Sequence, residues 1–413
     1  MKIWIQACLH GNEPAGAESI CLLADYLLNT KAGNNILKKI SLVIIPVANP
    51  DGYALQQRFS GSGLDLNRDQ SKLNDSVSLL LKKEFAVYSP DISLDIHEYN
   101  PIRSSLFKFC NRPVSMYEDV LFLSCGHLNI PANLREISNR LFVKSAADSL
   151  SNNGYSFGEY YSCKVEGDTL FALYNGKNPQ SSSTFHGLAN TISLFVEIRG
   201  IGLERKCLKR RSECGFLVAR SVLETAIRYK SYIRKELKKA YKQTMKGKEN
   251  IVVLADSKPS FSILSLIDLI NNKPFMYECP SFNALNLCPV LVRKRPKAYI
   301  LSPDCHLAVE KLKMFGIEVK EIEETIYIDA EIFLVTDAKR SLREWEKIFP
   351  VEVQTKMKKN KIKVVKGSFF VSVRQKLGNL LVTLLEPESI NGFVHFDVIP
   401  AKLGHKLPFV RLM

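Results

Sequence analysis

Histidine, glutamate, arginine and asparagine side chains stand in short polar motifs in the first half of the chain. The motifs are HGNE (10–13), NPDGYALQQR (49–58), DLNR (65–68), LDIHE (94–98) and FVEIRG (195–200). Two imidazoles and a carboxylate form a common ligand set for a catalytic zinc ion, and this set leaves one coordination position open for water. His10, Glu13 and His97 supply those groups. The sequence therefore predicts a site for zinc-assisted hydrolysis.

Further polar side chains could complete such a site. Glu197 follows the apolar run ISLFV, where a carboxylate is costly unless it has a role or a partner. We expect it to act as general base toward the attacking water; an ion pair with Arg199, on the same strand face, is the alternative. Arg58 could stabilise an oxyanion. Asn67 with Arg68 could bind a substrate carboxylate, because a guanidinium group matches a carboxylate bidentately.

Two aspartates could orient the histidines. Histidines that bind a metal usually donate their second ring N–H to a carboxylate or a carbonyl. Asp65 precedes Asn67 by two residues, and Asp95 precedes His97 by two. Either aspartate could be that acceptor, and helix capping or a solvated loop is the competing use.

The motifs lie between segments with alternating strand and helix patterns, which predict an α/β fold. Apolar runs at 2–8, 41–47, 91–96 and 191–198 predict strands. Apolar periodicity predicts helices at 15–28, 74–86, 113–123, 134–152 and 212–245. The composition of 49–68 and 153–189 indicates loops.

The length of 413 residues favours two domains. We expect a catalytic domain at 1–246 and, after a boundary near 246–250, a smaller β-rich or mixed accessory domain at 250–413. Its predicted strands are 250–254, 297–301, 332–336, 368–373, 379–385 and 393–398, and a Lys-rich turn (KMKKNKIK, 356–363) interrupts them.

Bulk properties narrow the classes of function. The formal net charge is +15, from 57 Lys+Arg and 42 Asp+Glu. The basic residues are spread out without a nucleic-acid motif, so we expect a solvated basic surface and no specific nucleic-acid partner.

None of the ten cysteines forms a CxxC pair, so a cysteine zinc finger is unsupported. No apolar run approaches the ~20 residues of a membrane span and no secretory signal opens the printed chain, so we expect a cytoplasmic protein.

The order of these motifs over about residues 2–212 resembles the zinc carboxypeptidase family M14. The segments DLNRDQSKL and LDIHEYNP look like a bacterial branch of that family. The resemblance implies a mixed central sheet flanked by helices, with the site at the strand ends. It implies that His10, Glu13 and His97 bind one zinc ion per chain and that Glu197 is the catalytic base. It also implies that Arg58 stabilises the oxyanion and that Asn67 and Arg68 bind the C-terminal carboxylate of a peptide substrate. Asp65 would be the partner of His10.

Other functions compete with this one. A deacylase resembling aspartoacylase or succinylglutamate desuccinylase would show similar HGNE and DLNR motifs and would hydrolyse N-acyl amino acids. NPDG followed by Tyr53, and the EIRG context of Glu197, favour the carboxypeptidase. A non-catalytic binding protein with a basic surface is the third possibility. The interval where the family has its substrate-capping tyrosine contains Tyr155, Tyr160, Tyr161 and Tyr174.

Overall fold

A six-stranded sheet carries the polar motifs. The structure is a computed structural model that describes residues 1–247 and 249–413. Its strands are β1 (Lys2–Ala7), β2 (Ser41–Ile45), β3 (Ile92–Tyr99), β5 (Val120–Phe122), β6 (Phe157–Glu159) and β9 (Ile192–Arg199), in the spatial order β2-β1-β3-β9-β5-β6. The first four strands in this order run parallel, whereas β5 is antiparallel to β9. The predicted mixed central sheet is confirmed.

Helices cover both faces of this sheet, and the alternation along β1 shows which helix covers which face. Ile3 and Ile5 pack with α1 (Pro14–Asn29) and α9 (Leu208–Arg228). Trp4 points to the other face, where it contacts Phe85 of α4 (Ser76–Tyr88) at 5.5 Å between ring centroids. Because both faces are covered, the inner strands are continuously buried. The other helices of the first 247 residues are α2 (Lys31–Leu37), α3 (Pro50–Ala54), α5 (Ser104–Cys110), α6 (Ala132–Glu136), α7 (Val143–Ser151), α8 (Ser182–Leu188) and α10 (Lys230–Lys246).

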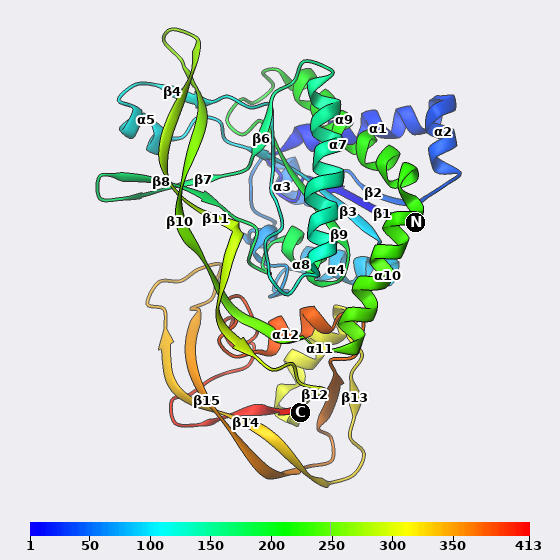
Figure 1. The fold of residues 1–413 in the computed structure, drawn as a ribbon, viewed down its shortest axis with the longest axis vertical. Coiled ribbons are helices and arrows are strands. Elements are labelled where there is room, and N and C mark those ends of the chain that lie inside the picture. Colours follow the sequence, from blue (N-terminus) through cyan, green and yellow to red (C-terminus); the bar gives the residue numbers. More distant parts are fainter. Residues whose placement is uncertain (248) are drawn as a thin grey trace.

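A second sheet joins strands from both halves of the chain. Its members are β4 (Val114–Met116), β7 (Ser162–Glu166), β8 (Thr169–Tyr174), β10 (Ile251–Asp268) and β11 (Lys273–Arg293). The long β10–β11 hairpin pairs antiparallel with β4 through β10 and parallel with β8 through β11. Figure 1 shows this hairpin reaching from the C-terminal part up to β4 and β8.

The remaining strands form a third sheet, which makes the C-terminal part β-rich as expected. They are β12 (Ala298–Leu301), β13 (Lys320–Glu321), β14 (Ile326–Arg340), β15 (Val351–Val364), β16 (Phe369–Ser372) and β17 (Lys406–Leu412), accompanied by α11 (His306–Met314) and α12 (Gly378–Leu385). One continuous hydrophobic core includes residues of both halves, from Ile3 to Phe409. The division into 1–246 and 250–413 stays a prediction, and Lys248, inside the predicted boundary, lies outside the described residues.

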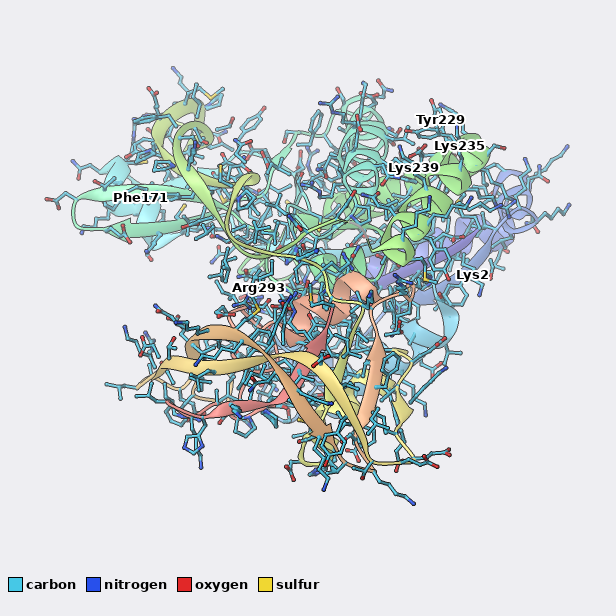
Figure 2. The ribbon with its side chains drawn as sticks, turned by 60° about the horizontal axis from the view of Figure 1, so that its bottom comes forward. Lys2, Phe171, Tyr229, Lys235, Lys239 and Arg293 are labelled. Atoms are coloured by element: carbon cyan, nitrogen blue, oxygen red, sulfur yellow. The ribbon has the colours of Figure 1, made fainter. Side chains whose placement is uncertain are left out.

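Buried ion pairs tie the hairpin to the third sheet. Arg293, at the end of β11, donates to Glu386 Oε2 at 2.8 Å and to Glu388 Oε2 at 2.6 Å. Arg411 Nε of β17 lies 3.3 Å from Glu386 Oε1. Figure 2 labels Arg293 at this junction. Burying these charges is tolerable because each has an opposite charge within contact distance.

Three expectations for the C-terminal half are wrong. Residues 379–385 lie in helix α12 and not in a strand; a short apolar run buried all round has no periodicity that separates the two structures. The Lys-rich segment 356–363 is part of strand β15, because the β14–β15 ribbon extends into solvent and lets the lysine side chains remain hydrated. Residues 393–398 form turns.

The first half also differs from expectation in places. Strands β4 and β5 replace the helix predicted at 113–123, and 153–189 contains β6, β7, β8 and α8 in addition to loops. The helix predicted at 212–245 is two helices that break at Tyr229. Short strands of three residues carry too little pattern to be recognised, since periodicity needs a longer window.

The basic residues of α10 lie on the surface. Arg234, Lys235, Lys238, Lys239 and Lys242 are all exposed, and Lys235 and Lys239 are labelled beside Tyr229 in Figure 2. Within the described part of the chain, no helix has the length and apolar character needed to cross a membrane.

Candidate active site

The HGNE motif forms the turn between β1 and α1. Glu13 is the residue immediately before the first turn of α1, and His10 follows the end of β1 by three positions. Gly11 packs directly on the NPDG turn: a Cβ atom at this position would lie 1.9 Å from the carbonyl carbon of Gly52. Only glycine permits this approach, so the two motifs depend on each other sterically.

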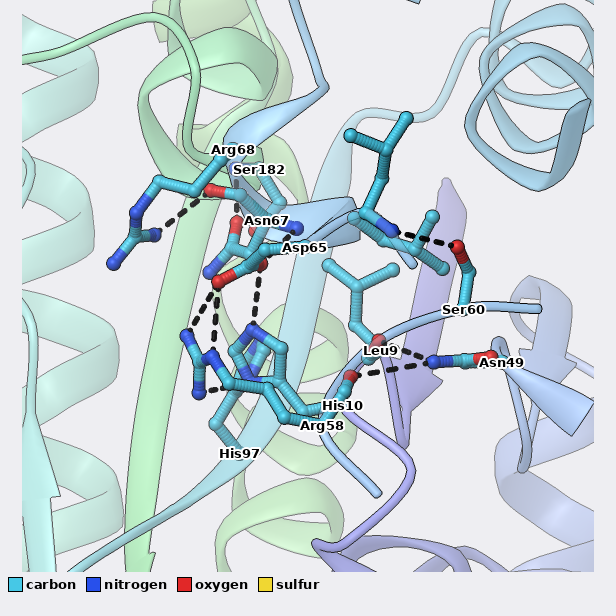
Figure 3. Close-up of polar contacts among 12 residues, drawn as sticks. Leu9, His10, Asn49, Arg58, Ser60, Asp65, Asn67, Arg68, His97 and Ser182 are labelled. Carbon is cyan, nitrogen blue, oxygen red and sulfur yellow. Dashed lines mark hydrogen bonds and ion pairs between the residues drawn. The ribbon is translucent and has the colours of Figure 1, made fainter. Parts of the chain in front are cut away.

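Three buried side chains converge beside this turn. Glu13 Oε1 lies 2.7 Å from His10 Nδ1, and Glu13 Oε2 lies 2.9 Å from His97 Nδ1. The two imidazole Nδ1 atoms are 3.1 Å apart. One donor atom from each residue lies within 4.8 Å of the others. His97 comes from β3, which pairs with β1 in the sheet. Strand pairing therefore brings His97, which is distant in the sequence, next to the HGNE turn (Figure 3).

The second nitrogen of each histidine faces an aspartate. His10 Nε2 lies 3.0 Å from Asp65 Oδ1, and His97 Nε2 lies 3.2 Å from Asp95 Oδ2. Asp65 is thus hydrogen-bonded to His10, Asp95 lies within ion-pair distance of His97, and both Nδ1 atoms are directed at Glu13. Orientation by an outer carboxylate is typical of histidines that bind a metal. The donor set, with two imidazoles and one carboxylate, fits zinc.

Electrostatics keep the two carboxylates around His10 ionised. Burial opposes ionisation of Glu13, yet the charges of His10 and His97 hold the pKa of its carboxyl well below the usual range. Burial likewise opposes ionisation of Asp65, and His10 and Arg58 lower its pKa. Both carboxylates are therefore anionic at neutral pH, as metal ligation and histidine orientation require.

Arg58 lies beside the three candidate ligands. Its Nε donates to Asp65 Oδ2 at 2.9 Å, and its Nη1 lies 3.2 Å from His10 Nδ1 and 3.8 Å from Glu13 Oε1. Figure 3 shows the guanidinium group between Asp65 and His10. About a third of the side chain is exposed, so the guanidinium group is both fixed in place and open to solvent. The residue can offer N–H donors to a substrate oxygen next to the metal site.

Asn67 and Arg68 follow Asp65 in a short helical turn, Leu66–Arg68. The Asp65 carboxylate caps this turn by accepting from the Asn67 backbone N–H at 2.8 Å. The Asn67 side-chain oxygen accepts from the Ser182 backbone N–H at 2.9 Å, and Arg68 Nη1 donates to Asn67 O at 2.9 Å. One segment therefore carries both the group that orients His10 and the two residues predicted to bind substrate.

Glu197 lies next to His97. The two residues are partners in the parallel pairing of β3 with β9, and Glu197 is only 7% exposed. Burial, followed by the charge of Glu13, raises the pKa of Glu197 to about 7. The alternative partner, Arg199, donates instead to Ser115 Oγ at 2.6 Å and to Met116 O. Glu197 is thus placed with the metal cluster.

Comparisons with known proteins agree with this chemistry. A family model described as zinc carboxypeptidase, peptidase M14, matches residues 1–84. Carboxypeptidase 2 of Trichophyton rubrum is 29% identical over 419 residues, which cover 100% of this chain and 76% of that protein. Carboxypeptidase 2 of Trichophyton tonsurans is 29% identical over 421 residues, with the same coverage. These matches support assignment of the chain to the zinc carboxypeptidases.

A similar solved structure is the metallo-carboxypeptidase from Pseudomonas aeruginosa in complex with (2-guanidinoethylmercapto)succinic acid. It is 19% identical to this carboxypeptidase, with a TM-score of 0.41, over 57% of this chain and 58% of that chain.

The protein is accordingly a zinc-dependent metallocarboxypeptidase, a peptide hydrolase. The relatives support this function over the N-acyl amino acid deacylase and over a non-catalytic binding protein. The relatives that match along the whole chain are fungal, so they do not support the predicted bacterial branch.

The structure distinguishes among the four tyrosines of this carboxypeptidase. Tyr155 donates its hydroxyl to Glu213 at 2.7 Å. Tyr161 and Tyr174 pack against each other, with ring centroids 5.9 Å apart. Burial, followed by the charge of Glu197, raises the pKa of Tyr160 to about 12. Of the four, Tyr160 is the one for which the charge of Glu197 is a leading cause of the shift.

Ser182 is a member of the site that sequence reasoning missed. Its backbone N–H holds Asn67, and its hydroxyl donates to Asp95, the partner of His97. It thereby links the substrate-binding segment to the metal cluster. The only signal in the sequence was the SSST run inside a loop of active-site composition, and that run does not distinguish one serine from the next.

Proposed function

We propose that this enzyme removes the C-terminal residue from peptides that carry a free C-terminal carboxylate. The observation that carries the proposal is the convergence of His10, Glu13 and His97 with a buried Glu197 on the neighbouring strand. These residues would hold one zinc ion per chain. The chemistry supplied by bound zinc is Lewis-acid polarisation of the scissile carbonyl.

The Arg68 guanidinium group and the Asn67 side-chain amide would bind the terminal carboxylate. A bidentate guanidinium–carboxylate pair fixes direction as well as position, so it selects the last peptide bond of the chain. Arg58 would donate to the carbonyl oxygen as negative charge develops there. Its guanidinium group is already oriented by Asp65, so little reorganisation accompanies the reaction.

Glu197 would move the proton. With a pKa raised to about 7, its carboxylate can accept a proton from the attacking water and then donate it to the leaving amine. The low exposure of Glu197 keeps bulk water from competing with this transfer. Tyr160 would close over the substrate, since its surroundings include Glu197 and Arg68.

The test is zinc content together with hydrolysis of three substrates. We expect about one zinc ion per chain and chelator-sensitive release of free amino acid from an N-blocked dipeptide. The same dipeptide with a C-terminal amide should be cleaved poorly, because Arg68 has no carboxylate to bind. N-acetylaspartate should not be hydrolysed. Equal cleavage of the amidated dipeptide, or preferred hydrolysis of N-acetylaspartate, would contradict the proposal.

A further inference from the structure

A tight turn of the C-terminal part contacts the segment that carries Asp65, Asn67 and Arg68. The turn spans 345–348, in the connection between β14 and β15. Trp345 N donates to Ile348 O at 2.8 Å, and Ile348 N donates to Trp345 O at 3.1 Å. This pairing closes a two-residue loop whose central residues are Glu346 and Lys347.

Both central residues of the turn have left-handed backbone conformations. The φ angles are 51° at Glu346 and 59° at Lys347, a region that favours glycine and costs other residues about 1 kcal/mol or more. Turns of this shape normally contain Asn or Gly. Glu346 and Lys347 are therefore both unfavourable residue types for their backbone conformation. The contacts of their side chains offset this conformational cost.

Each of these side chains reaches the segment around Asp65. The backbone N–H of Asp65 donates to Glu346 Oε2 at 2.9 Å, and Lys347 Nζ donates to the carbonyl oxygen of Ser62. In the opposite direction, Lys72 Nζ donates to the carbonyl oxygen of Glu346 at 2.8 Å. Two charged side chains from the turn and one from the segment thus connect the same two stretches of chain.

Aromatic packing holds the turn in place beside Lys72. The Trp345 and Phe396 rings stack with centroids 6.0 Å apart, and Lys72 Nζ lies 5.8 Å from the Trp345 centroid. Lys311 of α11 then donates to the carbonyl oxygen of Lys72 at 2.7 Å. Residues 62–73 are therefore supported from the C-terminal part at both ends.

We propose that Glu346 is a positioning residue for the catalytic centre, acting through Asp65. The Glu346 carboxylate fixes the Asp65 backbone, and the Asp65 carboxylate in turn orients His10 and Arg58. The C-terminal part thus contributes to the reaction without touching substrate or metal. This inference rests on the proposed function for its effect on turnover, but the contact between the two segments does not depend on that function.

The test compares four variants of the full-length chain. Glu346→Gly removes the side chain and also relieves the left-handed strain, so it should leave Tm unchanged or higher. Glu346→Ala removes the side chain without that relief. Glu346→Gln retains an oxygen that can accept the Asp65 N–H. Glu344→Ala is the matched control, because Glu344 is an exposed residue just before the same turn.

Direct partners of metal ligands typically contribute 10- to 100-fold to metal affinity or activity. Glu346 contacts such a partner, Asp65, and does not contact a ligand itself, so we expect a smaller effect. We expect Glu346→Gly and Glu346→Ala to lower kcat by about 3- to 10-fold and to weaken zinc binding by a similar factor. Glu346→Gln and Glu344→Ala should stay within about 2-fold of wild type. Wild-type kcat and zinc affinity in Glu346→Gly would overturn the proposal, as would a fall in Tm that parallels the loss of kcat.

Hydrogen exchange of residues 60–70 supplies a readout independent of turnover. The Asp65 amide should exchange faster in Glu346→Gly and Glu346→Ala than in wild type and Glu346→Gln, since its acceptor is gone. Unchanged exchange in Glu346→Gly would overturn the contact itself. If the wild-type protein bound no zinc and cleaved no peptide, the proposed function would fail, and the exchange data would still decide whether Glu346 fixes Asp65.

Discussion

His97 and Glu197 occupy paired positions on the parallel strands β3 and β9. The register of two buried strands therefore sets how the candidate metal ligand and the candidate general base lie relative to each other. A shift of one residue would turn one of these side chains to the opposite face of the sheet. The packing of the protein core thus fixes the relative placement of these two side chains.

Replacing Glu197 with Gln should abolish proton transfer and leave the metal in place. General acid–base catalysis commonly contributes about 10²- to 10⁴-fold, so kcat should fall by that order while zinc content stays near that of wild type. The measurement pairs steady-state kinetics with metal analysis. Glu204→Gln, at an exposed residue shortly after β9, is the control. Near-normal kcat in Glu197→Gln would remove Glu197 as the base.

Asp95→Asn should weaken zinc binding without removing a ligand. The Asp95 carboxylate lies 3.2 Å from His97 Nε2, and loss of such an outer carboxylate typically costs about 10- to 100-fold in affinity. Competition with a chelator of known affinity measures the change. Asp148→Asn, at an exposed position on α7, should bind zinc as wild type does. Equal affinities in the two variants would mean that Asp95 does not orient His97.

Arg68→Lys should act mainly on substrate binding. An ammonium group keeps the charge but cannot reproduce a two-point contact with a carboxylate. We expect KM for peptides with a free C-terminus to rise about 10-fold, which corresponds to about 1.4 kcal/mol, with a smaller change in kcat. On a C-terminally amidated peptide, wild type and variant should perform equally poorly. An unchanged KM on the free peptide would exclude Arg68 from the carboxylate site.

Lys82 should make the stability of the protein depend on pH. Its side chain is buried beside His186, with Nζ–Nε2 at 3.0 Å, and near Asp95, and burial lowers its pKa to about 7. The same lysine in the unfolded chain keeps its proton up to about pH 10.4. Between these values the unfolded state binds more protons, so the contribution of Lys82 to the free energy of unfolding increases as pH rises.

Lys82→Met tests this directly, because methionine has similar length and no charge. Denaturant unfolding at pH 6.5, 8 and 9.5 should show a smaller rise in the free energy of unfolding for Lys82→Met than for wild type. Other titrating groups contribute equally to the pH dependence of both proteins, so their contributions cancel in the difference between wild type and Lys82→Met. Parallel pH profiles for the two proteins would show that Lys82 keeps an ordinary pKa in the folded state.

The sequence could predict which residues are the candidate metal ligands, because they stand in short motifs that set both the residue type and the local geometry. His10 and Glu13 lie on one turn, and that turn follows a recognisable strand. His97 and Glu197 end apolar runs whose parallel pairing brings them together. The roles of Ser182 and Glu346 could not be read in this way, since serine and glutamate are common surface residues. Glu346 also contacts Asp65 from 281 positions away in the chain.

The β-rich half was harder to predict for a different reason. Helix α12 is buried on every side, so its sequence has no apolar stripe that would distinguish it from a strand. Strand β15 is stabilised by pairing along its full length with β14, and its lysines do not oppose that pairing because they are exposed. In both segments tertiary context, not local pattern, decides the structure.

The β10–β11 hairpin has a consequence for biosynthesis. Strands β4 and β8 emerge from the ribosome long before the strands that pair with them, residues 251–268 and 273–293. At about 5–20 residues per second, the wait between β8 and the end of β11 is on the order of ten seconds. During this time β4 and β8 expose unpaired backbone groups that can associate with other chains. The second sheet can therefore close only after β10 and β11 have been synthesised.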